Sequence, residues 1–211
     1  MRCDKKDLLL YAVTDRHWLN GRTLHEVVKE SLDGGVTFVQ LREKQLDEEH
    51  FLQEAKDLKE LCSEYHVPFV INDNVELAIE MDADGVHVGQ EDMAAKKARA
   101  LLGPDKILGV SAHNPEEARK AQEDGADYLG CGAAFVTGTK LDAKPITAEM
   151  MKAVTESVEI PVVAIGGITE DNIPKLTGRG LAGAAVVSAI FAAEDPRKAS
   201  ERLLEKIRQW E

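Results

Sequence analysis

Eight short aliphatic runs alternate with amphipathic stretches along the 211 residues, and this alternation predicts an α/β fold. Each run is four to seven residues long, too short for a helix of its own and suited to a strand buried on both faces. Strict alternation implies parallel strands with right-handed crossovers. We therefore expect a single-domain (β/α)8 TIM barrel over residues 1–211. A doubly wound open sheet remains the structural alternative.

The elements are expected in a regular order. The predicted strands are LLLYAVT (8–14), VTFVQL (36–41), PFVIN (68–72), GVHV (85–88), ILGV (107–110), DYLGC (127–131), PVVAIG (161–166) and GAAVV (183–187). Typical N-capping residues precede the helical stretches, namely Thr23 (with Glu26 as a capping box), Asp47, Asn114 (with Pro115 and Glu117), Thr147 and Thr169. A last helix is expected over about 195–210.

The composition restricts the classes of partner. The formal net charge is −12, from 26 basic and 38 acidic residues, which argues against nucleic acid or a membrane surface as a partner. The three cysteines have neither metal-ligand spacing nor a disulfide pattern. No secretory signal and no apolar run of membrane-spanning length is evident, so we expect a cytoplasmic protein. The oligomeric state stays open, a homo-oligomer included.

The stretch FVQLREKQ (38–45) combines a buried strand with a cluster of charge. Side chains alternate along a strand, so Gln40, Arg42 and Lys44 would share one face and Leu41 the other. In a barrel the first face is the lumen, and active sites lie at the carboxyl ends of the strands. The pattern thus predicts an anion site at the barrel mouth. Alternatively, Arg42 and Lys44 form only a solvated strand end that pairs with carboxylates.

The other strand ends favour the functional interpretation. Polar, charged or glycine residues follow nearly every predicted strand: Asn72 and Asp73, Asp92, Ser111, Thr137 to Lys140, Gly166 and Gly167, and Val187 and Ser188. The amino ends of the strands lack this bias. We therefore expect one polar rim.

A magnesium site is predicted on this rim. Mg²⁺ commonly binds one or two carboxylates together with substrate phosphate oxygens, a role that suits Asp73 and Asp92. The alternative for Asp92 is an N-cap of the helix in MAAKKARALL. Gly166 and Gly167 with Ser188 are expected to offer backbone N–H groups to a phosphate.

Several stretches closely resemble signature segments of the thiamin phosphate synthase family: VTFVQLREK, PFVINDNVELA, DADGVHVGQEDM, LGVSAHN, TGTK and VVAIGGI. The resemblance runs in order from Tyr11 to Ser188. It implies a transferase that couples 4-amino-5-hydroxymethyl-2-methylpyrimidine diphosphate to a thiazole phosphate or its carboxylated form. The products would be thiamin phosphate and pyrophosphate.

The resemblance also implies site residues. The pyrimidine diphosphate would be bound by Gln40, Arg42, Lys44, Asn72, Ser111 and Lys140. Leu41 and Glu43 of the same stretch are included in the substrate-binding set, although the Glu43 side chain is expected to point away. The thiazole phosphate would be bound by Thr137, Gly138, Thr139, Gly167, Val187 and Ser188. Mg²⁺ would be held by Asp73 and Asp92. The catalytic set would be Arg42, Lys44, Ser111 and Lys140. One departure is the run with Ala133, Ala134 and Val136, where the family often has prolines, so we expect a less rigid loop.

The implied chemistry is a dissociative, Mg²⁺-assisted substitution. The ring amino group can stabilise positive charge on the carbon that loses pyrophosphate, and the thiazole nitrogen needs no general base. Catalysis would then come from cations that stabilise the leaving group. Two other functions stay open: an isomerase resembling thiazole tautomerase, and a non-catalytic barrel that binds a phosphate ligand. His87 is open as well, as a structural, hydrogen-bonded residue or a catalytic one.

Overall fold

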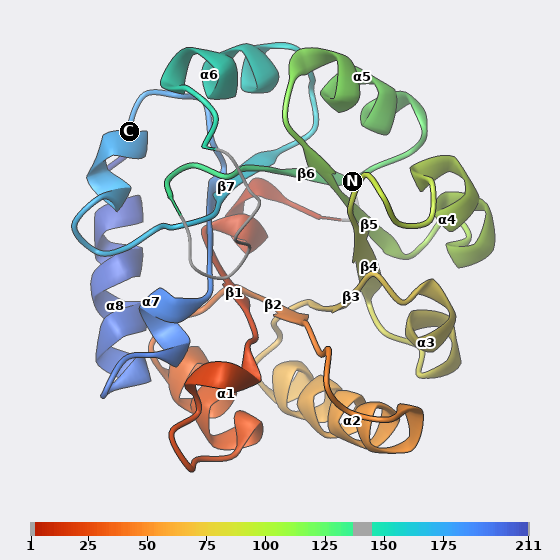
Figure 1. Ribbon diagram of the computed structural model, residues 1–211, viewed down its shortest axis with the longest axis vertical. Helices are drawn as coiled ribbons and strands as arrows, with labels where there is room; N and C mark the ends of the chain where they lie inside the picture. The colour runs from red at the N-terminus through yellow and green to blue at the C-terminus, as the bar shows by residue number, and fades with distance from the viewer. Residues whose placement is uncertain (1–2, 137–144, 211) are drawn as a thin grey trace.

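The computed structural model describes residues 3–136 and 145–210, and within them eight parallel strands close into a barrel in sequence order (Figure 1). β1 pairs with β8, with Leu10 opposite Ala184, so the sheet has no open edge. The strands are β1 Leu10–Val13, β2 Phe38–Leu41, β3 Phe69–Asn72, β4 Gly85–Val88, β5 Ile107–Ala112, β6 Tyr128–Gly132, β7 Val162–Ile165 and β8 Gly183–Val186. The predicted barrel is confirmed and the open sheet is excluded.

Helices surround the barrel (Figure 1). They are α1 Leu24–Asp33, α2 Glu48–Glu64, α3 Val75–Glu80, α4 Ala95–Leu102, α5 Pro115–Glu123, α6 Ala148–Glu156, α7 Ser188–Phe191 and α8 Pro196–Ile207, with 3₁₀ turns η1 Lys5–Leu8, η2 Arg16–Trp18 and η3 Ile173–Leu176. The N-caps predicted at Thr23, Asp47, Asn114 and Thr147 are confirmed, each side chain accepting a backbone N–H three residues on.

Two capping interpretations are wrong. Thr169 is not the N-cap of a helix, because the next helical element is only the short 3₁₀ turn η3, and Asn172 is the residue that precedes it. Asp92 is not the N-cap of α4 either, since that helix begins after Ala94, and Asp92 instead accepts the Gly89 N–H (2.7 Å).

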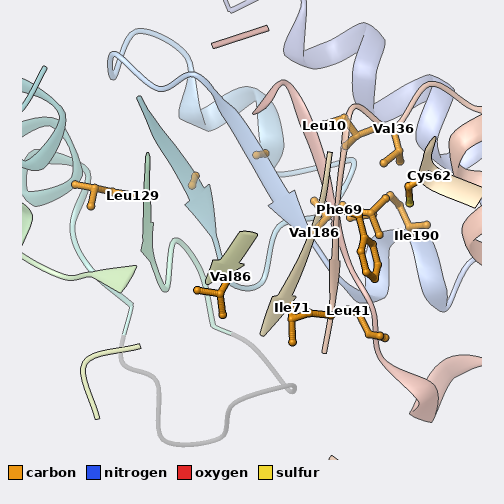
Figure 2. Packing of buried hydrophobic residues seen from close by; sticks show 14 of the residues in the cluster. Leu10, Val36, Leu41, Cys62, Phe69, Ile71, Val86, Leu129, Val186 and Ile190 are labelled. Atoms are coloured by element: carbon orange, nitrogen blue, oxygen red, sulfur yellow. The ribbon is translucent and has the colours of Figure 1, made fainter. Parts of the chain in front are cut away.

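Two apolar layers hold the barrel. Outward-facing side chains pack between strands and helices, and Figure 2 shows Leu41, Phe69 and Ile71 in this layer. Alternate positions on the same strands face the lumen, where Phe38 and Val70 belong to a separate inner cluster. The predicted alternation through FVQLREKQ is therefore confirmed, with Leu41 outside and Gln40 inside.

The amino end of the barrel is filled by apolar side chains. Cys3 and Leu8, from the segment before β1, are fully buried in the inner cluster with Ile107 and Ala182. A ligand therefore reaches the lumen from the carboxyl ends of the strands. Among residues 3–136 and 145–210, every helix is too short or too polar to cross a bilayer.

Candidate active site

A pocket opens at the carboxyl ends of the strands. The predicted site residues that line it come from β2, β3, β5 and the segments after β2, β3, β7 and β8: Gln40, Arg42, Asn72, Asp73, Ser111, Gly167, Val187 and Ser188. These members of the polar rim expected from the strand ends thus surround one cavity. His87, whose role the sequence left open, lines the pocket too.

Other predicted residues lie beside the pocket or away from it. Lys44 reaches the rim through an ion pair with Asp73. The Leu41 side chain is fully buried in the outer apolar layer, so it does not face the pocket. The predicted ligand residues Thr137, Gly138, Thr139 and Lys140 lie outside the described residues. Their roles stay predictions.

The loop after β6 is bonded to β7. Ala134 N–H donates to the Ile165 carbonyl (2.8 Å) and Phe135 N–H donates to the Gly166 carbonyl (3.0 Å). Ala133 lines the pocket. The part of the loop that lacks the family's prolines therefore continues the β6–β7 pairing through its backbone.

The end of β1 holds Arg42 in place. The Thr14 hydroxyl, which is fully buried, accepts the Arg42 N–H (2.9 Å) and donates to the Arg42 carbonyl (3.2 Å). The next residue, Asp15, pairs with the Arg42 guanidinium (3.6 Å). Backbone and side chain of Arg42 are therefore both fixed by consecutive residues of one neighbouring segment.

Glu43 points away from the pocket, as expected. Its carboxylate lies 2.9 Å from Arg16 Nε, and its side chain is 2% exposed. Burial alone would raise the pKa of Glu43, but hydrogen bonds from the Gln45 backbone and from Arg16 outweigh it and leave this pKa below its ordinary value. Glu43 is therefore ionised at neutral pH.

The predicted metal ligands form a carboxylate pair. Asp73 Oδ2 lies 2.8 Å from Lys44 Nζ, and Asp73 Oδ1 accepts the Asn72 side-chain N–H (2.6 Å). Partial burial raises the pKa of Asp92, and its hydrogen bond with the Asp73 carboxyl raises it further. The neighbouring carboxyl therefore favours the protonated form of Asp92, an effect that a divalent cation between the two groups would reverse.

The pair fits Mg²⁺ better than a metal with many protein ligands. Within residues 3–136 and 145–210, three or more His, Cys, Asp or Glu side chains do not gather into a metal-binding group. Mg²⁺ needs one or two carboxylates when substrate oxygens and water complete its octahedron. Asp73 and Asp92 offer two carboxylates of this kind, so the donor set fits Mg²⁺.

A chain of hydrogen bonds crosses the lumen below the pocket. Gln40 Nε2 donates to the Tyr11 hydroxyl, which lies 2.7 Å from the Tyr128 hydroxyl. The chain continues from Tyr128 to His87 Nδ1 (3.0 Å) and from His87 Nε2 to the Ser111 hydroxyl (3.1 Å). It therefore joins two predicted ligand residues, Gln40 and Ser111, through three buried rings.

The two tyrosines and the histidine of this hydrogen-bond chain are held in defined states. Burial raises the pKa of Tyr11 and Tyr128 well above the ordinary value, so both phenols stay protonated. His87 is hydrogen-bonded on both ring nitrogens, as its structural interpretation expects. Glycine makes room for these rings, because a Cβ on Gly109 would collide with the Tyr128 ring and with His87.

The opposite part of the rim has a different character. Gly166 and Gly167 adopt the left-handed backbone conformation (φ +98° and +63°), which few other residues tolerate. The Gly167 carbonyl accepts the Asn172 side-chain N–H (2.8 Å). Ser188 begins the short helix α7 beside this turn. Among the described residues, this part of the rim offers an anion backbone N–H groups and the Ser188 hydroxyl rather than cations.

Sequence reasoning missed Tyr11, Tyr128 and the triplet Thr14, Asp15 and Arg16. The tyrosines occupy lumen-facing positions of their strands, a signal that strand alternation contains. The triplet directly follows β1: Thr14 ends the predicted strand 8–14, and Asp15 and Arg16 lie just beyond it. Its role depends on side-chain contacts between segments 28 residues apart, which no local pattern reveals.

Comparisons with known proteins find similar sequences and a similar structure along nearly the whole chain. A family model described as thiamine monophosphate synthase matches residues 10–190. The thiamine-phosphate synthase of Clostridium tetani is 49% identical over 197 residues, which cover 93% of this chain and 94% of that protein. That of Methanobrevibacter smithii is 50% identical over 202 residues, covering 96% of each. A solved structure of thiamine phosphate pyrophosphorylase from Pyrococcus furiosus has a TM-score of 0.90 and 41% identity, and the match covers 98% of each chain.

Proposed function

Because the chain belongs to the thiamine monophosphate synthase family, we propose that it joins 4-amino-5-hydroxymethyl-2-methylpyrimidine diphosphate to a thiazole phosphate, carboxylated or not, and releases pyrophosphate. It is an enzyme of the transferase class and acts in thiamine biosynthesis. The C–O bond to the diphosphate breaks, and a bond from the same carbon to the thiazole nitrogen forms. With the carboxylated thiazole phosphate, the ring carboxyl group would also leave as CO₂.

One observation carries the proposal: the rim offers two different anion sites around one lumen. Arg42, Lys44 and the pair of carboxylates gather at β2 to β4, whereas the glycine turn and Ser188 follow β7 and β8. Figure 1 shows these two groups of strands in different parts of the ring. A diphosphate at the first and a phosphate at the second would direct both reacting ends toward the centre.

The first site supports the departure of pyrophosphate. Arg42 and Lys44 would neutralise charge that develops on the leaving oxygens. One unit-charge contact at 4 Å amounts to roughly 4 kcal/mol at an effective dielectric of about 20. Half of that, applied to the transition state alone, changes the rate by more than about tenfold. Mg²⁺ held by Asp73 and Asp92 would supply Lewis-acid stabilisation of the same charge. Lys140 stays a prediction for this role.

The lumen would stabilise the positively charged pyrimidine fragment that remains when pyrophosphate leaves. Gln40 lines the pocket and donates its amide N–H to Tyr11, so its Oε1 would be the group left to accept a hydrogen bond from the ring amino group. Accepting that hydrogen bond stabilises the ring as its amino group delocalises positive charge onto it. The thiazole nitrogen already has a lone pair, so positioning it over the carbon suffices, and no general base is required.

A cytoplasmic setting completes the proposal. Cys3, Cys62 and Cys131 are buried free thiols, a state typical of proteins in a reducing compartment. Burial raises the pKa of each to about 12, so none is a nucleophile at neutral pH.

The test is to mix both substrates with Mg²⁺ and quantify products by chromatography. We expect thiamin phosphate and pyrophosphate in equal amounts, and neither product when one substrate is omitted. Conversion of the thiazole phosphate alone to an isomer would show a tautomerase instead. Binding of both substrates without turnover would show a binding protein.

A further inference from the structure

The Glu43 carboxylate organises the loop that carries Lys44. Its Oε1 accepts the backbone N–H groups of Lys44 (2.7 Å), Gln45 (2.6 Å) and Leu46 (3.4 Å). Three consecutive N–H groups that point at one oxygen bend the chain around it, as in an anion-binding turn. The loop after β2 therefore takes its shape from a side chain of its own.

The other carboxylate oxygen ties this loop to the scaffold. Glu43 Oε2 accepts from Arg16 Nε (2.9 Å), and Arg16 Nη2 donates in turn to Glu54 of α2 (2.5 and 2.7 Å). The Glu43 side chain is 2% exposed and Glu54 is 20% exposed, so solvent screens these contacts less than surface pairs. Arg16 thus clamps the loop between η2 and α2.

We propose that Glu43 is a positioning residue that sets the location of Lys44 for the diphosphate, with Arg16 as its anchor. The inference rests on the proposed function of the rim. Glu43 does not face the pocket, so it acts through its neighbour. Its hydrogen bond to the Lys44 N–H fixes the backbone from which the ammonium reaches Asp73. Without that anchor Lys44 would have to be ordered when the ligand binds, and affinity would fall.

The experiment is a double-mutant cycle between Glu43→Ala and Lys44→Ala. Binding of inorganic pyrophosphate in the presence of Mg²⁺ is measured by calorimetry, and KM for the pyrimidine diphosphate is measured in parallel. We expect Glu43→Ala alone to weaken pyrophosphate binding roughly tenfold and to raise KM more than it lowers kcat. In the Lys44→Ala background the same change should add less than about twofold. An equal loss in both backgrounds would overturn the proposal.

Glu43→Gln keeps the test valid if the alanine variant folds poorly. The amide retains an acceptor oxygen for the three N–H groups but loses its charge toward Arg16, so pyrophosphate binding should lie between wild type and Glu43→Ala. If Glu43→Gln binds pyrophosphate as weakly as Lys44→Ala does, and the effects of these two substitutions are additive, a role of Glu43 through Lys44 is contradicted.

The matched control is Glu201→Ala, which removes the exposed pair with Arg197 (3.1 Å) on α8. It should leave pyrophosphate binding unchanged, and an equal loss there would point to overall charge instead.

This readout separates two kinds of failure. If the wild-type protein binds pyrophosphate but makes no thiamin phosphate, the proposed function is wrong, and the double-mutant cycle on pyrophosphate binding can still be measured. If the wild-type protein turns over but the effects of Glu43→Ala and Lys44→Ala on pyrophosphate binding are additive, only the positioning role is wrong.

Discussion

Lys44 Nζ lies 2.8 Å from Asp73 Oδ2, so the end of β2 presents a cation to a carboxylate at the end of the neighbouring strand β3. The Lys44 side chain is 54% exposed, and an ion pair this open to solvent contributes at most about 1 kcal/mol to stability. The pair therefore matters through its place on the rim. It keeps the Lys44 ammonium next to the carboxylates that we expect to hold Mg²⁺, and therefore next to the expected position of the diphosphate.

Lys44→Ala should weaken diphosphate recognition while leaving the fold intact. We expect KM for the pyrimidine diphosphate to rise roughly tenfold or more, because one partly solvated charge contact is lost. Thermal unfolding should shift by no more than about 2–4 °C. Lys120→Ala is the control, since it removes a lysine–aspartate pair of similar length (2.7 Å) on α5. A KM equal to that of wild type would remove Lys44 from the site.

Tyr128→Phe should disturb both ends of the lumen chain. The substitution removes the hydroxyl that bonds Tyr11 and His87 and leaves ring packing nearly unchanged. Because buried partners then lose a hydrogen bond, we expect a loss of about 1–3 kcal/mol in stability and a fall in kcat. Denaturant unfolding and steady-state kinetics measure the two effects.

Tyr65→Phe provides the comparison, since its hydroxyl bonds Asp33 and Lys29 on the surface. That variant should keep wild-type kcat. Unchanged kcat in Tyr128→Phe as well would show that the chain supports only the fold.

Gly167→Ala should act on the thiazole phosphate alone. A Cβ there would collide with the Val136 carbonyl, and φ is +63°, a region that disfavours alanine. We expect KM for the thiazole phosphate to rise several-fold while KM for the pyrimidine diphosphate stays the same. Gly178→Ala is the control for backbone strain. Its φ is also positive (+75°), but a Cβ there would have no neighbouring atom within 4 Å. Equal effects of Gly167→Ala on both KM values would contradict two separate anion sites.

Regular periodicity made the barrel predictable from sequence. Alternation along FVQLREKQ placed Gln40 and Leu41 on opposite faces, and the polar strand ends marked the rim around Asp73 and Ser188. These inferences needed only the period of a strand and the direction shared by parallel strands. Strand alternation is kept in the folded protein because burial of the apolar side chains fixes which face of each strand points to the helices.

Local signals failed where tertiary contacts decide. Thr169 carries the sequence signal of a cap, yet only the short 3₁₀ turn η3 follows it, with Asn172 as the preceding residue. Glu43 reads as one charge among several, and its three backbone partners depend on the fold of its own loop. Tyr11 and Tyr128 meet across the lumen from positions 117 residues apart. No pattern within one strand contains that contact.

If charges on the rim stabilise pyrophosphate as it leaves the pyrimidine, replacing Asp92 should slow its release. Asp92 neither caps α4 nor belongs to the apolar core, so Asp92→Ala should fold normally. The measurement is single-turnover release of pyrophosphate at limiting Mg²⁺, compared with wild type. We expect the rate of pyrophosphate release to fall at least about tenfold. A rate equal to that of wild type would contradict it.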